Sequence, residues 1–263
     1  MQSIDQEVRR RIQSNPRLLY QTTPKVSSNY WAVFDGSKQS FIHGKREYMR
    51  REIASLTKMM TAYTIIELCK QYKLKLAHIR IEICSVAANI RGTSAKLRKG
   101  DVLSAEQLMY GMMLPSGNDA AFALAKYFGK LLFDRKGYGE KDIQRIRSYQ
   151  FNYHPYYVKY FLKQMNDNAV ALKMTSSNFD SPHGLMNIQN QSTAYDMARL
   201  ASKAMGSPTF RKVVGTKNYV CHPFRRQEVA KKPRQNSEME PRTIQINDWD
   251  NGEGEKQPVS LIE

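Results

Sequence analysis

Cysteine is scarce in this 263-residue chain, and its positions exclude two kinds of site. The three cysteines are Cys69, Cys84 and Cys221. An odd number at such wide separations does not make a disulfide framework, and no C-x-x-C pair is present for zinc or redox chemistry. We expect buried free thiols. A metal site is not expected either, because the five histidines lie far apart and no H-E-x-x-H occurs.

Long apolar runs are absent as well, so the sequence predicts no membrane span. The N-terminus carries Arg9, Arg10 and Arg11 with no apolar stretch behind them, and we expect no secretory signal there. The compartment stays open. A composition of 41% hydrophobic and 10% aromatic residues can nevertheless bury a substantial core.

Negative charge is the scarcer sign. The formal net charge is +17, and residues 222–263 hold 7 Lys/Arg against 8 Asp/Glu, which leaves +18 for residues 1–221. Such a field favours anionic partners, although a merely solvated basic surface is the simpler interpretation. We expect no nucleic-acid role, because zinc-finger spacing, an aromatic ribonucleoprotein motif and a basic region joined to heptads are all missing.

The hydrophobic pattern predicts an α+β domain with its helices segregated from its strands. Residues 1–25 are expected to form an N-terminal arm, residues 26–221 the folded domain, and residues 222–263 a disordered polar tail. The elements predicted inside the domain are a hairpin over 29–34 and 39–43, helices over 54–71, 104–114, 120–128, 156–172 and 193–205, and a strand over 210–219.

Ser55 and Lys58 form an S-x-x-K tetrad at the start of the helix predicted over 54–71. Three residues make about one helical turn, so the serine hydroxyl and the lysine amine share a face. Serine needs a base to accept its proton, and lysine serves if burial or nearby cations lower its pKa. The helix N-terminus also offers unpaired N–H groups for an oxyanion. The tetrad predicts a nucleophile with its base, although chance also produces this spacing.

A second motif, Ser116-Gly117-Asn118, follows 61 residues after Ser55, in a loop between two predicted helices. S-x-N also occurs at 27–29 and 176–178, so the order of the motifs is more informative than the spacing. S-x-x-K, an S-x-N-type motif and K-T-G follow one another in penicillin-binding proteins and class A β-lactamases. Neither a G-x-S-x-G elbow nor a glycine-rich phosphate loop is present.

Longer segments carry a resemblance to a known family. These blocks are REIASLTKMMTAYTIIE (51–67), LSAEQLMYGMMLPSGNDAAFALAKYFG (103–129), MNDNAVALKMTSSNFDSPHGL (165–185) and QSTAYDMARLA (191–201). In this order they resemble the serine D-Ala-D-Ala carboxypeptidases, or low-molecular-mass penicillin-binding proteins, over roughly residues 28–220. The resemblance implies a β-lactamase/transpeptidase-like α+β fold with an antiparallel sheet and a helical lobe.

The resemblance also implies a role for each matching side chain. Ser55 would form the acyl-enzyme, Lys58 would be the general base, Ser116 would relay the proton, and Asn118 would hold the substrate's peptide carbonyl. The reaction would remove the terminal D-Ala from a peptidoglycan peptide ending in D-Ala-D-Ala, and β-lactams would acylate the same serine. No metal or cofactor would be needed. Two further matching residues are expected to be structural, His183 and Asp196.

The family's third motif, K-T-G, is absent, and Gly215-Thr216-Lys217 has the reverse order. In relatives this motif lies on a strand that closes the cleft, where it binds the substrate carboxylate. Without its cation we expect Lys58 to stay protonated more of the time, with impaired activity. We also expect missing C-terminal sheet strands and an unpaired edge on the hairpin at 29–43. The corresponding hypothesis is a truncated or mispredicted product, or a degenerate homologue.

Two alternatives remain beside the carboxypeptidase. A class A β-lactamase needs a deacylating glutamate, usually in an E-x-x-x-N pattern, and this pattern is absent. A catalytically inactive homologue could instead use its basic cleft to hold acidic cell-wall or other anionic polymer. Family members usually act outside the cytoplasm.

Overall fold

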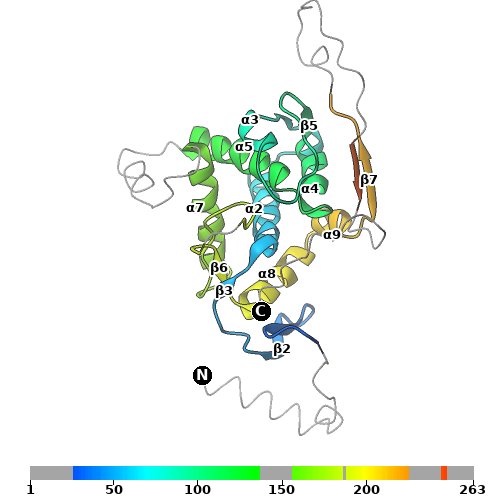
Figure 1. The fold of residues 1–263 in the computed structure, drawn as a ribbon. Helices are drawn as coiled ribbons and strands as arrows, with labels where there is room; N and C mark the ends of the chain where they lie inside the picture. Colours follow the sequence, from blue (N-terminus) through cyan, green and yellow to red (C-terminus); the bar gives the residue numbers. More distant parts are fainter. Residues whose placement is uncertain (1–25, 137–155, 186–187, 225–243, 248–263) are drawn as a thin grey trace, which may run out of the picture.

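The structure is a computed structural model that describes residues 26–136, 156–185, 188–224 and 244–247. The predicted arm over 1–25 and most of the predicted tail lie outside these residues. Helix α2 (Thr57–Gln71) runs through the middle of the molecule, and the other helices surround it (Figure 1). These are α3 (Ser85–Ala88), α4 (Ala105–Met113), α5 (Asn118–Lys136), α7 (Tyr156–Ala171), α8 (Ala194–Met205) and α9 (Pro208–Val214).

Helix α2 forms the centre of the core because apolar or small residues occupy nearly every face of it. Ten of its fifteen residues are buried, among them Met60, Ile65 and Leu68. Burying one large apolar side chain completely contributes about 1.5–3 kcal/mol. A one-turn 3₁₀ helix, η2 (Ala54–Leu56), precedes α2, so Ser55 lies just before the helix that the sequence predicted to contain it. The predicted helix is therefore confirmed, with its start three residues later.

Helices α4 and α5 hold the second motif between them. The Ser104 hydroxyl accepts from the amide of Gln107, and the Gln107 side chain accepts from the amide of Ser104, which forms a capping box at the start of the helix predicted over 104–114. Pro115 follows the end of α4, and Asn118 begins α5. The intervening loop is tight enough to give Ser116 a φ of 57°.

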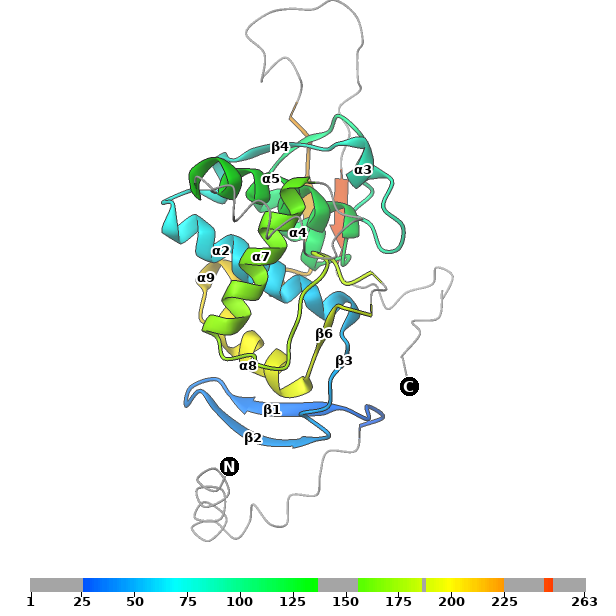
Figure 2. The same cartoon turned by 90° about the vertical axis from the view of Figure 1, so that its left-hand side faces the viewer.

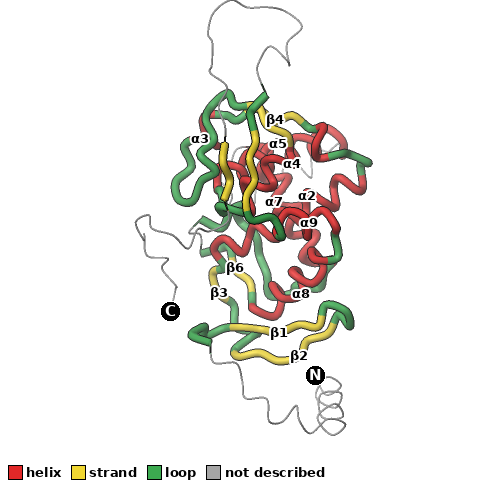
Figure 3. The backbone as a smooth tube through the Cα atoms, turned by 90° about the vertical axis from the view of Figure 1, so that its right-hand side faces the viewer, coloured by secondary structure: helices red, strands yellow, loops and turns green. Residues whose placement is uncertain are grey.

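Among the described residues, the strands form four separate antiparallel pairs around the helices (Figures 2 and 3). Hairpin β1–β2 lies along α8, where the Phe41 ring packs on Tyr195 at 5.5 Å between centroids. The predicted hairpin and the α+β class are confirmed. The four pairs are β1 (Trp31–Asp35) with β2 (Ser40–Lys45), β3 (Arg51–Glu52) with β6 (Gln191–Ser192), β4 (Arg80–Glu82) with β5 (Val102–Ser104), and β7 (Asn218–Cys221) with β8 (Ile244–Asn247).

The strand predicted over 210–219 is wrong for most of its length, since α9 occupies 208–214 and only β7 is extended. The Ser207 hydroxyl caps α9 by accepting from Phe210, and Pro208 stands in its first turn, where its missing N–H costs nothing. Phe210 and Val213, three residues apart, bury one face of the helix. β8 is a further difference: it lies within the segment predicted as a polar tail, and Ile244 is buried against the core.

Candidate active site

Three segments meet at the amine of Lys58. Its Nζ lies 3.1 Å from the Ser55 hydroxyl, 2.8 Å from Asn118 Oδ1 and 2.9 Å from the backbone oxygen of His183. The first contact spans three residues of sequence, whereas the other two come from α5 and from the loop before β6. The structure thus brings together three of the predicted site residues: Ser55, Lys58 and Asn118.

Ser55 and Lys58 differ in their exposure to solvent. Ser55 is exposed, whereas the Lys58 side chain is only 2% accessible although lysine is almost always at the surface. A reactant from solvent therefore meets the hydroxyl first, and the amine stays behind it in a water-poor pocket.

Burial lowers the pKa of Lys58 from 10.5 to about 8, and the negative charge of Asp119 opposes part of that effect. With this pKa, roughly one amine in ten is neutral at pH 7. From the sequence, either burial or a neighbouring cation was expected to lower the pKa of Lys58. In this structure burial is the main cause of the lowering.

The partners of Lys58 also orient its lone pair. A neutral amine has two N–H groups and one lone pair, and both the Asn118 amide oxygen and the His183 carbonyl can only accept. The two N–H groups therefore go to these acceptors, and the lone pair faces the Ser55 hydroxyl, which can donate. The site is built so that the uncharged lysine points its basic site at the serine.

Asn118 is fixed from both sides. Its Nδ2 donates to the Arg91 carbonyl at 2.9 Å, and its backbone amide donates to the Thr93 carbonyl at 2.8 Å. Within the part of the chain that the structure describes, only one of the two Nδ2 hydrogens is used in this way. Next to it, the Asp119 carboxylate accepts from the amides of Ala95 and Leu97, which holds the neighbouring loop in place.

Ser116 lies in the loop between α4 and α5, two residues before Asn118. Its carbonyl accepts from the Thr93 hydroxyl, and its side chain is half-buried. Within the described ranges its hydroxyl makes no hydrogen bond to Ser55 or Lys58. The structure therefore places Ser116 beside Asn118 but does not by itself show a proton path through it.

The loop over 181–184 is a part of the site that the sequence reasoning missed. The Thr61 hydroxyl donates to the Pro182 carbonyl at 2.7 Å, which fixes the adjacent His183 carbonyl over Lys58. Gly184 has a φ of +78°, and an added Cβ would lie 1.8 Å from the carbonyl oxygen of Ala54. The glycine in SPHGL was the available signal, because only this residue allows such a close approach at positive φ.

The two residues expected to be structural have different surroundings. Asp196 is buried, and its carboxylate accepts from the amide of Ser176 and the hydroxyl of Ser177, which ties α8 to a neighbouring loop. The ring of His183 accepts from the amide of Leu185 through Nδ1, whereas its backbone carbonyl contacts Lys58. The residue type at position 183 does not reveal this contact, because every residue has a backbone carbonyl.

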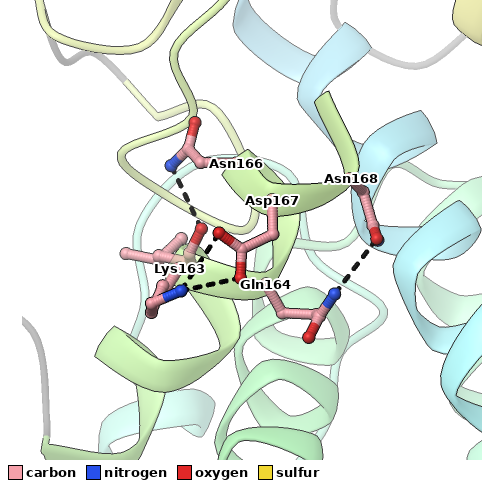
Figure 4. Close-up of polar contacts among 6 residues, drawn as sticks. Lys163, Gln164, Asn166, Asp167 and Asn168 are labelled. Carbon is pink, nitrogen blue, oxygen red and sulfur yellow. Dashed lines mark hydrogen bonds and ion pairs between the residues drawn. The ribbon is translucent and has the colours of Figure 1, made fainter. Parts of the chain in front are cut away.

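Helix α7 supports the surroundings of Lys58 through two asparagines. The Asn166 side chain bonds both backbone groups of Phe179, donating to the oxygen at 2.8 Å and accepting from the amide at 2.9 Å. Asn168 donates to the Thr64 hydroxyl at 3.0 Å and so ties α7 to α2. Figure 4 shows both side chains on α7, beside the Lys163–Asp167 ion pair. Helix α7 thus supports both the segment that leads into the 181–184 loop and the helix that carries Lys58.

Other kinds of site find no support in the described ranges. No group of three His, Cys, Asp or Glu side chains there is placed to hold a metal ion. None of the helices among those residues combines the length and the apolar character needed to cross a bilayer.

Comparison with known proteins identifies the family. A family model described as D-alanyl-D-alanine carboxypeptidase matches residues 19–130 and 156–248. The chain belongs to this family. The match reaches residue 248, so the expectation that the family resemblance ends near residue 220 is wrong, and β7 and β8 fall inside it.

Curated members of the carboxypeptidase family align with most of this chain. The D-alanyl-D-alanine carboxypeptidase of Streptomyces sp. strain K15 is 34% identical over 76% of the chain and 62% of its own length. The enzyme DacF of Bacillus subtilis is 27% identical over 66% of the chain and 38% of its own length. The chain therefore spans less than two thirds of either relative.

Solved structures confirm the DD-peptidase fold. The crystal structure of the Streptomyces K15 DD-transpeptidase superposes with a TM-score of 0.68 at 28% identity, covering 88% of this chain and 76% of that one. The carboxypeptidase DacD from Francisella tularensis gives a TM-score of 0.61 at 28% identity, covering 76% and 42%. The transpeptidase-like fold implied by the resemblance is thus confirmed.

Proposed function

We propose that this chain carries the acylation site of a serine D-Ala-D-Ala carboxypeptidase, which removes the terminal D-Ala from a peptidoglycan peptide and reacts covalently with β-lactams. The observation that supports this proposal best is the buried Lys58 amine, whose Nζ lies 3.1 Å from the oxygen of the exposed Ser55 hydroxyl. Family membership supplies the substrate class.

In the first step the Ser55 oxygen attacks the carbonyl carbon of the penultimate D-Ala while its proton passes to Lys58 Nζ. The C–N bond then breaks, the proton goes to the departing D-Ala amine, and an ester joins the peptide to Ser55. Water attacks this ester, Lys58 again accepts the proton, and the serine is regenerated. Each proton is returned, so the cycle needs neither metal nor cofactor.

The second motif contributes the opposite rim. Asn118 positions Lys58 through its Oδ1, and its remaining Nδ2 hydrogen is available to donate to a peptide carbonyl. Ser116 is assigned the relay of the proton from Lys58 to the leaving amine, for which its loop lies beside Asn118. Both roles place a polar group where the acylation transition state develops charge.

A labelling experiment with fluorescent penicillin tests the proposal. The unaltered chain should be labelled covalently, and Ser55→Ala should abolish the label. Ser85→Ala is a matched control, because Ser85 is also an exposed serine at the start of a short helix, α3. D-Ala release from a peptide ending in D-Ala-D-Ala is measured in parallel.

Covalent label that survives in Ser55→Ala would contradict the proposed nucleophile. Complete absence of label and of D-Ala release from the correctly folded chain would instead support the inactive, polymer-binding homologue.

A further inference from the structure

A basic depression lies at the opposite end of α2 from Ser55. It measures about 460 Å³ and opens broadly to solvent. Its lining consists of Lys73, Leu74, Lys75, His78, Ile79, Arg80 and Tyr127. Three permanent cations and a histidine thus share one depression, and no carboxylate lines it.

The cations of this depression are not neutralised by their neighbours. Among the described residues, neither Lys73 nor Lys75 forms an ion pair, and Arg80 donates only to the backbone oxygen of Ala77 while its guanidinium covers the Phe224 ring at 3.8 Å. Like charges that line one depression repel one another. An anion bound among them would relieve that repulsion, which makes the depression an electrostatic site for a negative ligand.

Backbone hydrogen bonds hold the cationic segment in shape. The amide of Leu74 donates to the Cys69 carbonyl at 2.8 Å, and the amide of His78 donates to the Lys75 carbonyl at 2.9 Å. Strand β4, which begins at Arg80, pairs with β5. The charged side chains therefore project from a fixed backbone, and binding costs little ordering of the chain.

We propose that this depression binds a polymer that carries phosphate groups along its length. Lysine and arginine are the main phosphate-binding side chains, and here they line an open depression rather than a closed cup. An open row of cations suits successive phosphates better than one enclosed ion.

A polymer without bases fits the depression better than single-stranded nucleic acid. Base recognition requires exposed aromatic faces on which bases stack. The Phe224 face is covered by Arg80, and Tyr127 is half-buried beside the Phe128 ring, at 5.3 Å between centroids. The three cations of the lining outnumber its rings, those of His78 and Tyr127, which favours a bare phosphate backbone.

The depression is separate from the acylation site. Helix α2 has fifteen residues, which corresponds to a length of about 22 Å between the two ends. A polymer held at this end leaves Ser55 open to its substrate. The inference is thus independent of the proposed function.

Fluorescence anisotropy of the full chain with labelled inorganic polyphosphate tests the inference over a series of salt concentrations. The charge reversals Lys73→Glu and Lys75→Glu together should weaken binding at least ~10-fold and flatten the dependence of log Kd on log salt. Lys38→Glu with Lys217→Glu changes the net charge equally at exposed positions elsewhere, and should weaken binding no more than ~2-fold.

Equal weakening in both double variants would overturn the inference, because the general field of the protein would then account for binding. No binding by the unaltered chain, or tighter binding of single-stranded DNA of equal charge, would overturn it too. Thermal unfolding and penicillin labelling of each variant confirm that the fold and the Ser55 site are intact. Loss of labelling alone would concern the proposed function and not the depression.

Discussion

Lys58 is the residue on which the proposed chemistry depends, because it is buried as an amine among acceptors. Its pKa of about 8 is low for lysine and results chiefly from burial. Three contacts to oxygen satisfy the protonated form, whereas the neutral form uses two and turns its lone pair to Ser55. The same pocket therefore accommodates both protonation states, as a base that is used and restored requires.

The first prediction concerns pH. Since only neutral Lys58 accepts the serine proton, the acylation rate should rise ~10-fold for each pH unit below the pKa and level off above about 8. The measurement is the second-order rate of penicillin acylation between acidic and alkaline pH. A rate that is flat between pH 6 and 8, or that falls over this range, would contradict the assignment of Lys58 as base.

The second prediction adds a charge beside the base. Asn118→Asp keeps the side-chain shape but can place a carboxylate 2.8 Å from Lys58 Nζ, which stabilises the ammonium and raises the pKa of Lys58. Acylation at pH 7 should fall more than ~10-fold, and its rise with pH should move to higher pH. An unchanged pH profile would show that Asn118 does not set the protonation of Lys58.

The third prediction concerns Gly184. In Gly184→Ala the new Cβ would meet the Ala54 carbonyl at 1.8 Å at a positive φ, so the start of the Ser55 turn must move. Acylation should fall, and unfolding should become easier by more than ~1 kcal/mol. Gly36→Ala is the control, since its Cβ meets only the Ser202 hydroxyl at 3.7 Å. Equal behaviour of the two variants in thermal unfolding and penicillin labelling would refute the argument.

At the scale of elements, α7 acts on the site from a distance. Asn166 secures both backbone groups of Phe179, four residues before the carbonyl that contacts Lys58, whereas Asn168 contacts α2 itself. The site therefore depends on a helix that contributes no side chain to it.

The fourth prediction separates these two supports. Asn166→Ala leaves the Phe179 backbone without its partner and should cost about 1–3 kcal/mol of stability and slow acylation. Asn168→Ala should lower stability alone. Thermal unfolding and penicillin acylation of both variants make the test. If Asn168→Ala slows acylation as much as Asn166→Ala, then Asn166 does not act on acylation through the 181–184 loop.

Elements with their own local signals could be predicted from the sequence. The helix predicted over 104–114 has a capping box at Ser104 and Pro115 after its end, and the predicted hairpin has its turn at Asp35, so neighbouring residues fix both elements. Helix α9 was missed because β-branched residues at 213 and 214 resemble a strand, whereas Ser207 and burial against the core decide otherwise.

At the scale of the whole molecule, tertiary contacts explain what sequence reasoning could not supply. The motif order correctly indicated that Lys58 and Asn118 would meet, although 60 residues separate them. The His183 carbonyl could not be foreseen, since any residue provides the same backbone group. Strand β8 was missed because its partner, β7, is remote in sequence, so local composition suggested a tail.

Helix α2 thus begins just after Ser55 and ends just before the cationic depression. If a polymer is tethered to that depression, the serine can process only those peptides that lie within the radius set by the helix and the slack of the polymer. The length of α2 would then set the distance between the bound polymer and the zone of cleavage.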